Sequence, residues 1–139
     1  MKGYYISTNK NLLNMAKIHR EVKASYWGSY RTPELTKKTI DSSICFGVFT
    51  NSDEQVGFGR VLTDKVVFAY IMDVLVFEPH KGKGLGKFLI KTMMEYPEIK
   101  NVLTIALKTK DAHILYESFG FKRVGDSELW MAIDRAKLD

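Results

Sequence analysis

A glycine- and lysine-rich stretch follows a long apolar run and leads directly into an amphipathic segment; it reads Lys81-Gly82-Lys83-Gly84-Leu85-Gly86-Lys87. Its three glycines allow the backbone to approach a ligand without obstruction by Cβ atoms. The helix expected after them begins with unpaired N–H groups and the positive end of its dipole. Lysines add positive charge, and no acid lies between Pro79 and Met94. These residues predict a binding site for a polyphosphorylated ligand.

The glycine spacing excludes two common phosphate-binding motifs. A P-loop ends in Gly-Lys-Ser/Thr, whereas Phe88 follows Gly86-Lys87 here. A dinucleotide-binding fingerprint needs a third glycine three positions after the second, and Lys87 or Leu89 stands there instead. The ligand is therefore expected to be neither a P-loop nucleotide nor a Rossmann dinucleotide.

Asp73 is the only charged residue in the apolar run over residues 66–77. Burying an unpaired carboxylate is costly, so Asp73 must be paired, hydrogen-bonded or facing a wet cleft. It could hold or deprotonate an amine substrate through water. It could instead accept N–H groups at a strand distortion, or pair with Arg31 or Arg60.

Two motifs resemble those of the GNAT superfamily of N-acetyltransferases, enzymes that use acetyl-coenzyme A. Lys81-x-x-Gly84-x-Gly86 after a strand is similar to the family's pyrophosphate loop, Gln/Arg-x-x-Gly-x-Gly/Ala, with Lys in place of Gln or Arg. The stretch Thr109-Lys-Asp-Ala112-His-Ile-Leu115-Tyr116-Glu-Ser-Phe-Gly120-Phe121 is similar to the later motif Asn-x-x-Ala-x-x-Leu-Tyr-x-x-x-Gly-Phe. The resemblance extends over about residues 44–131.

The resemblance implies acetyl-CoA as cofactor and assigns residues to it. In the family the strands corresponding to residues 66–77 and 102–107 splay apart, and the pantetheine arm inserts between them. This assigns Val74, Leu75 and Val76 as backbone contacts for pantetheine, and Lys81 with Gly82 to Lys87 as the pyrophosphate site. Thr109 stands where relatives often carry an Asn that contacts the cofactor, and Thr is shorter.

Tyr116 is the best candidate for proton transfer. Acetyl transfer to an amine needs a deprotonated nucleophile, a stabilised oxyanion and a proton for the departing thiolate. The resemblance matches Tyr116 to the motif tyrosine near the thioester sulfur, and a backbone N–H of residues 74–76 to the oxyanion. Its spacing alone would also fit a ring that packs between helix and sheet. No strong general base is visible, so Asp73 is the second catalytic candidate.

The elements that must position these residues follow from periodicity. Helices are expected over residues 11–23, from Thr32-Pro33-Glu34 onward, over 85–96 and over 111–119, and strands over 4–7, 44–50, 55–63, 66–77, 102–107, 121–124 and 128–133. The order predicts an α+β fold, a single GNAT-like domain over residues 1–139. Its sheet is mixed and mostly antiparallel, with a central splayed parallel strand pair and helices on both faces.

The acetyl acceptor is expected to bind at the connection between the first two helices. Tyr26, Trp27, Tyr30 and Arg31 place three aromatic rings and a cation there. The same rings could instead anchor the connection to the core. The sequence leaves a small amine, an amino acid, an aminoglycoside-like compound, a peptide amino terminus or a protein lysine open as acceptor.

Composition sets the remaining expectations. With 45% apolar residues and no apolar run long enough for a membrane span, the chain is expected to be a cytoplasmic protein without membrane contact or metal, a monomer or homodimer. A lone Cys45 offers no disulfide and no neighbouring His, which favours direct transfer over an acyl-enzyme. The net charge of +5 does not require nucleic acid as a partner.

Two rival functions stay open at this point. The first is a catalytically silent acyl-CoA sensor, favoured by the weak base candidates and by Thr109. The second is a basic nucleic-acid-binding module, which would need several phosphate contacts.

Overall fold

The computed structural model describes residues 1–136, which form two compact units: a larger one, Met1–Lys108, and a smaller one that begins at Thr109. The larger unit contains the whole sheet, the glycine-rich loop and the expected acceptor region. The smaller unit contains Tyr116 and Thr109.

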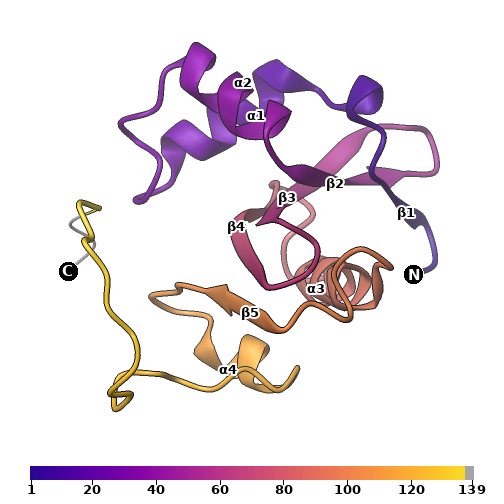
Figure 1. Cartoon of the computed structure of the whole chain (residues 1–139). Helices are drawn as coiled ribbons and strands as arrows, with labels where there is room; N and C mark the ends of the chain where they lie inside the picture. Colours follow the sequence, from indigo (N-terminus) through magenta and orange to yellow (C-terminus); the bar gives the residue numbers. More distant parts are fainter. Residues whose placement is uncertain (137–139) are drawn as a thin grey trace. The chain divides into compact units, whose positions relative to one another are not determined.

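The larger unit is built on a five-stranded mixed sheet in the order β1-β2-β3-β4-β5. The strands are β1 (Tyr4–Ser7), β2 (Ile44–Thr50), β3 (Gln55–Thr63), β4 (Phe68–Val76) and β5 (Thr104–Leu107) (Figure 1). Neighbours pair antiparallel except β4 and β5, which pair parallel. This confirms the expected α+β fold with a mixed, mostly antiparallel sheet. The predicted central place of the parallel pair is wrong for the described residues: the pair lies at the end of the strand order, because the strands expected after it do not form.

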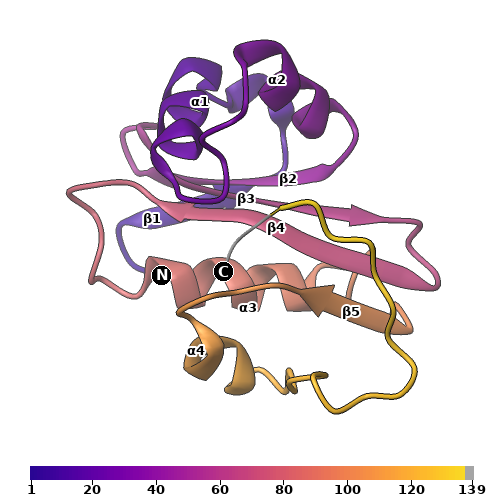
Figure 2. The ribbon, with the colours of Figure 1, turned by 90° about the vertical axis from the view of Figure 1, so that its left-hand side faces the viewer.

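Helices cover both faces of this sheet. The helices α1 (Met15–Ala24) and α2 (Pro33–Asp41) lie on one face, and α3 (Leu85–Glu95) lies on the other (Figure 2). The Thr32 side chain caps α2 and Pro33 occupies its first turn, as expected. The first helix begins later than predicted because the Asn14 side chain accepts from the Lys17 N–H, and a short 3₁₀ helix, Lys10–Leu12, precedes it.

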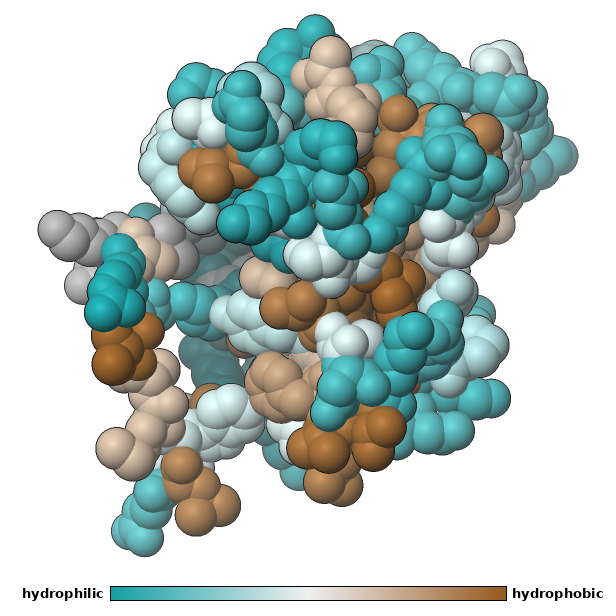
Figure 3. Space-filling view, turned by 45° about the horizontal axis from the view of Figure 1, so that its top comes forward, coloured by the Kyte–Doolittle hydropathy of each residue, from teal (hydrophilic) through white to brown (hydrophobic). Residues whose placement is uncertain are grey.

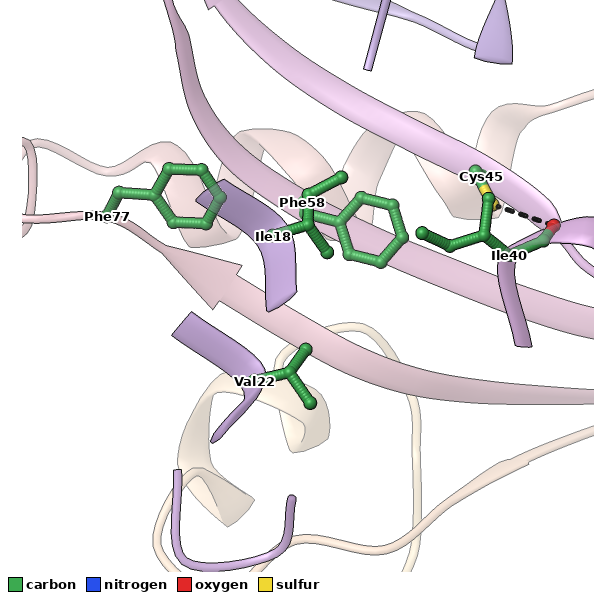
Figure 4. Packing of buried hydrophobic residues seen from close by; sticks show 6 residues of the cluster. All are labelled: Ile18, Val22, Ile40, Cys45, Phe58 and Phe77. Carbon is green, nitrogen blue, oxygen red and sulfur yellow. Dashed lines mark hydrogen bonds between the residues drawn. The ribbon is translucent and has the colours of Figure 1, made fainter. Parts of the chain in front are cut away.

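Hydrophobic side chains of α1 and α2 pack on the sheet. The cluster comprises Ile18, Val22, Ile40, Cys45, Phe58 and Phe77, all at most 3% exposed (Figure 4). Burial of such side chains stabilises each by about 1.5–3 kcal/mol relative to exposure. The outward sides of the two helices are charged, and hydrophilic side chains dominate this part of the surface (Figure 3).

A β-bulge interrupts the pairing of β3 with β4. The register shifts between Phe58 and Arg60, and Asp73 on the opposite strand has a φ of +54°. A non-glycine residue at positive φ is strained and is held there by its surroundings. Gly59 lies at the same place, where an added Cβ would collide with the Met93 side chain of α3. The bulge therefore lies under α3.

The smaller unit contains α4 (His113–Glu117), which ends before Gly120 at a φ of +93°, as expected for a C-cap glycine. The strands predicted over residues 121–124 and 128–133 are wrong, because these residues are coil in the structure. Leu129, Met131 and Ile133 are 82–94% exposed. A strand needs a neighbour for its backbone N–H and C=O groups, and apolar composition alone does not supply one.

Candidate active site

The open edge of β4 is the first feature of the site. Pairing with β5 covers only Phe68 to Ile71, opposite Thr104 to Leu107. Beyond Ile71, β4 continues through Asp73 to Val76 and stays paired with β3 on its other side. Within the described chain, the stretch that contains Val74, Leu75 and Val76 has no strand on the β5 side. Its backbone is thus placed to bind an extended ligand by hydrogen bonds.

The glycine-rich loop lies between β4 and α3. Gly82 and Gly84 have φ values of +81° and +83°, which side chains rarely adopt. A Cβ built on Gly82 or Gly86 would meet no other atom within 4 Å, so the loop surface is open there. The first hydrogen bond of α3 runs from the Phe88 N–H to the Gly84 carbonyl. The N–H groups of Leu85, Gly86 and Lys87 precede it and have no partner within the helix.

The loop lysines are exposed and differ in their partners. Lys81 lies 3.6 Å from a Glu78 carboxylate oxygen, a surface pair of small energy. Lys83 and Lys87 are exposed at the start of α3. Together with the helix dipole they make the loop favourable for an anion. The structure thus brings together the residues that the sequence assigned to the pyrophosphate.

Asp73 is buried at 8% exposure between two arginines. Arg31 donates through both terminal nitrogens, at 2.5 Å and 2.9 Å, to the two carboxylate oxygens. The Arg60 Nε donates to one of the same oxygens at 2.8 Å, while Arg60 Nη1 donates to the Ser43 hydroxyl at 3.0 Å. The sequence left Arg31 and Arg60 open as alternative partners of Asp73, and in the structure Asp73 pairs with both.

Arg31 connects this cluster to the expected acceptor region. Its guanidinium carbon lies 5.6 Å from the centre of the Trp27 ring and 5.8 Å from that of Tyr30. Burial lowers the pKa of Arg31, but the hydrogen bonds to Asp73 and Tyr30 outweigh it and raise the pKa above its ordinary value. Arg31 is permanently charged. Tyr26 and Tyr30 are 50% and 70% exposed, so their rings are accessible from solvent.

Tyr116 lies on α4 in the smaller unit and is 8% exposed. Its ring packs edge-on against Phe121, with centroids 5.8 Å apart. Burial and the nearby Asp111 carboxylate raise the pKa of the Tyr116 phenol to about 12. The phenol therefore carries its proton at physiological pH. In the same unit, the Thr109 hydroxyl accepts a hydrogen bond from the Ala112 N–H at 3.0 Å.

Cys45 is buried in β2 and its thiol hydrogen bonds to the Ile40 carbonyl at 3.5 Å (Figure 4). Burial raises the pKa of this thiol to about 11, although Lys10 and Arg60 act in the opposite direction. A buried, protonated thiol is a poor nucleophile. The structure thus gives no support to an acyl-enzyme at Cys45.

Sequence reasoning missed several residues that the fold brings to this region. Arg60 was considered only as one partner of Asp73, yet a lone arginine among the apolar residues of β3 was a signal of a buried ion pair. Leu35, Lys38, Thr39 and Ser42 join Tyr30 and Arg31 around a cavity, and no spacing in the sequence indicates this.

The mixed sheet contains a parallel strand pair that separates near a bulge, and a glycine loop beside it starts a helix. This arrangement is the one expected for an acetyltransferase. Comparison with known proteins agrees, because residues 41–123 match the acetyltransferase (GNAT) domain family. The chain belongs to the GNAT acetyltransferase family.

Individual relatives extend the likeness over nearly the whole chain. A solved GNAT-family protein of Xanthomonas campestris pv. campestris is 34% identical with a TM-score of 0.92, covering 99% of this chain and 97% of its own. A candidate acetyltransferase of Gibberella zeae is 26% identical over 86% of this chain and 79% of its own. The uncharacterised N-acetyltransferase ycf52 of Pyropia yezoensis is 27% identical over 86% of this chain and 71% of its own.

Among the described residues, no helix is both long enough and apolar enough to cross a membrane. The same residues contain no group of three or more His, Cys, Asp or Glu side chains that could hold a metal ion.

Proposed function

We propose that this protein transfers an acetyl group from acetyl-CoA directly to the amine of a small molecule or peptide, in a ternary complex. The observation that carries this proposal is the glycine loop and the start of α3 beside the open edge of β4. The glycine loop and the start of α3 suit a pyrophosphate, and the open edge of β4 suits an extended pantetheine arm. The family membership gives the reaction class.

The residues proposed to hold the cofactor fit its chemistry. The N–H groups at the start of α3, with Lys81, Lys83 and Lys87, suit the phosphates. The backbone of Val74 to Val76 suits the amides of the arm. Thr109 is proposed as a further contact through its hydroxyl. When bound, acetyl-CoA supplies the acetyl group as a reactive thioester.

Tyr116 is proposed as the proton donor to the departing thiolate. The raised pKa of about 12 keeps its phenol protonated, which a donor requires. Its assignment rests on the motif that it shares with the family. Proton transfer of this kind contributes about 10² to 10⁴ in rate, and the low end applies to a thiolate, which leaves readily.

Asp73 is proposed to act near the amine, but its bonding limits what it can do. Both carboxylate oxygens already accept from guanidinium groups. Its oxygens are therefore engaged in holding Arg31 and Arg60. It is better suited to fix Arg31 and the bulge than to remove a proton, and water is the expected acceptor of the amine's proton.

The acceptor is proposed to bind beside the connection of α1 and α2. Tyr26, Trp27, Tyr30 and Arg31 offer rings, hydroxyls and a cation there. Arg31 reaches from these rings to Asp73 on β4, next to Val74, so one side chain joins the acceptor region to the proposed pantetheine strand.

Thiol release from acetyl-CoA with a panel of amines tests the proposal. The expected result is amine-dependent release of free coenzyme A by the wild-type protein, accompanied by an acetylated amine in the mass spectrum. Binding of acetyl-CoA without turnover on any amine would instead identify a silent acyl-CoA sensor, the reading that the lack of a strong base favours. An absence of binding would contradict both functions.

A further inference from the structure

A cavity beside α2 has a positively charged lining. It has a volume of about 170 Å³ and is lined by Tyr30, Arg31, Leu35, Lys38, Thr39 and Ser42. Two of these residues are cationic and three carry hydroxyl groups. None of the described residues around it carries a carboxylate. Such a lining favours a ligand group that is negatively charged and accepts hydrogen bonds.

The buried cluster behind this cavity has an uncompensated positive charge. Arg31 and Arg60, 7% and 5% exposed, share the single carboxylate of Asp73. The remaining Arg60 contacts are neutral: the Ser43 hydroxyl and, at 3.5 Å, the Met72 sulfur. No second acid pairs with either guanidinium among the residues that the structure describes. An excess buried cation is costly, and an anion from outside would offset part of that cost.

Arg31 belongs to both features, because it lines the cavity and binds Asp73. Asp73 precedes Val74, where the backbone proposed for the pantetheine arm begins. A ligand with its anionic end at Arg31 and Lys38 would thus lie beside the reaction centre. A simple alkylammonium ion would be repelled by the excess positive charge. A zwitterion, with an amine and an anion, would not.

We infer that the acetyl acceptor is a small amine that also carries a carboxylate or phosphate group, and that this anionic group binds at Arg31 and Lys38. The inference rests on the proposed acetyltransferase function and adds the substrate class. Lys38 is a specificity-determining residue in this account. It contacts the anion and takes no part in acetyl transfer.

Matched pairs of probes separate the anion from the amine. Phosphoethanolamine is compared with ethanolamine, and β-alanine with β-alaninamide. Each probe is titrated into the full chain saturated with coenzyme A, and binding is followed by the chemical shifts of the protein. The expected result is binding at least about tenfold tighter for at least one probe that carries the anionic group than for its partner without that group, which is a simple alkylammonium ion. The two pairs show whether phosphate or carboxylate is preferred.

Two neighbouring lysines on α2 provide the variant and its control. Lys38→Ala is expected to reduce the affinity for the preferred anionic probe by about two- to fivefold, because Lys38 is an exposed charge. Lys37→Ala is expected to leave that affinity unchanged, since Lys37 pairs with Asp41 at 2.6 Å and does not line the cavity. In turnover assays Lys38→Ala should raise KM for the anionic acceptor and leave kcat alone.

The inference is overturned if probes with and without the anionic group bind alike, if none of the four binds, or if Lys38→Ala retains the full affinity. Failure of the proposed function looks different. Anionic probes would bind selectively, but no amine of any kind would release coenzyme A from acetyl-CoA.

Discussion

Arg31 and Asp73 are 42 positions apart in the sequence, and they form a two-pronged ion pair with N–O distances of 2.5 Å and 2.9 Å. The pair ties the connection between α1 and α2 to the one residue of β4 with positive φ. The residue with positive φ in β4 is thus also the residue that holds Arg31, and with it the proposed acceptor region, against the sheet.

Asp73→Asn should destabilise the fold by about 3–5 kcal/mol, because it leaves two buried guanidinium groups without their anion. Chemical denaturation measures the loss. Asp41→Asn serves as control: Asp41 pairs with Lys37 on the exposed face of α2, so less than about 1 kcal/mol should change. A stability near that of wild type for Asp73→Asn would contradict the structural role.

The same variant addresses catalysis. If Asp73 only fixes the bulge and Arg31, the rate per folded molecule stays near that of wild type at every pH. A loss of turnover that is largest where the substrate amine is protonated would instead make Asp73 the base.

Local sequence signals predicted much of the fold. β2 and β3 have the expected bounds because polar turns end both strands, and Thr32-Pro33 starts α2 because cap and ring geometry act locally. The strand predictions within residues 121–133 were wrong for the opposite reason, because a strand needs a partner strand from elsewhere in the chain. The glycine loop was readable from one segment, whereas Arg60 and Lys38 reach the site only through tertiary packing.

Cys45 should form no acetyl-enzyme. Its buried thiol, with a pKa raised to about 11, stays protonated at pH 8. Intact-protein mass after incubation with acetyl-CoA should show no added acetyl group on Cys45, and Cys45→Ala should retain turnover per folded molecule. A cysteine-linked acetyl group that disappears when an amine is added would contradict direct transfer.

The same thiol gives a pH dependence of stability. Its pKa is raised on folding from an ordinary value of 9.0. Its contribution to stability is therefore complete below about pH 9 and is lost as the pH rises toward 11. Cys45→Ala should be less sensitive than wild type to alkaline pH in this range, as followed by urea denaturation. An equal loss of stability in wild type and Cys45→Ala as the pH rises would contradict the raised pKa of this thiol.

Tyr116→Phe should lower kcat by about tenfold to a few hundredfold while the variant still folds and binds acetyl-CoA. Because the pKa of the phenol is about 12, wild type should show no loss of activity from phenol ionisation at pH 10. Steady-state kinetics against pH provide the check. Tyr96→Phe, which removes only a hydroxyl 3.5 Å from that of Thr8, should leave kcat unchanged. An unchanged kcat in Tyr116→Phe would assign Tyr116 a packing role.

Gly86→Glu tests cofactor binding at the glycine loop most directly. Its backbone has ordinary φ, its added Cβ meets no atom, and an acid in the first turn of α3 suits the helix dipole. The variant should fold like wild type, yet its carboxylate would occupy and repel the phosphate site. Gly125→Glu, in a coil of the smaller unit, is the matched control. In a calorimetric titration with acetyl-CoA, wild type and Gly125→Glu should bind, and Gly86→Glu should not. Wild-type affinity in a folded Gly86→Glu protein would contradict the cofactor site, and with it the proposed function.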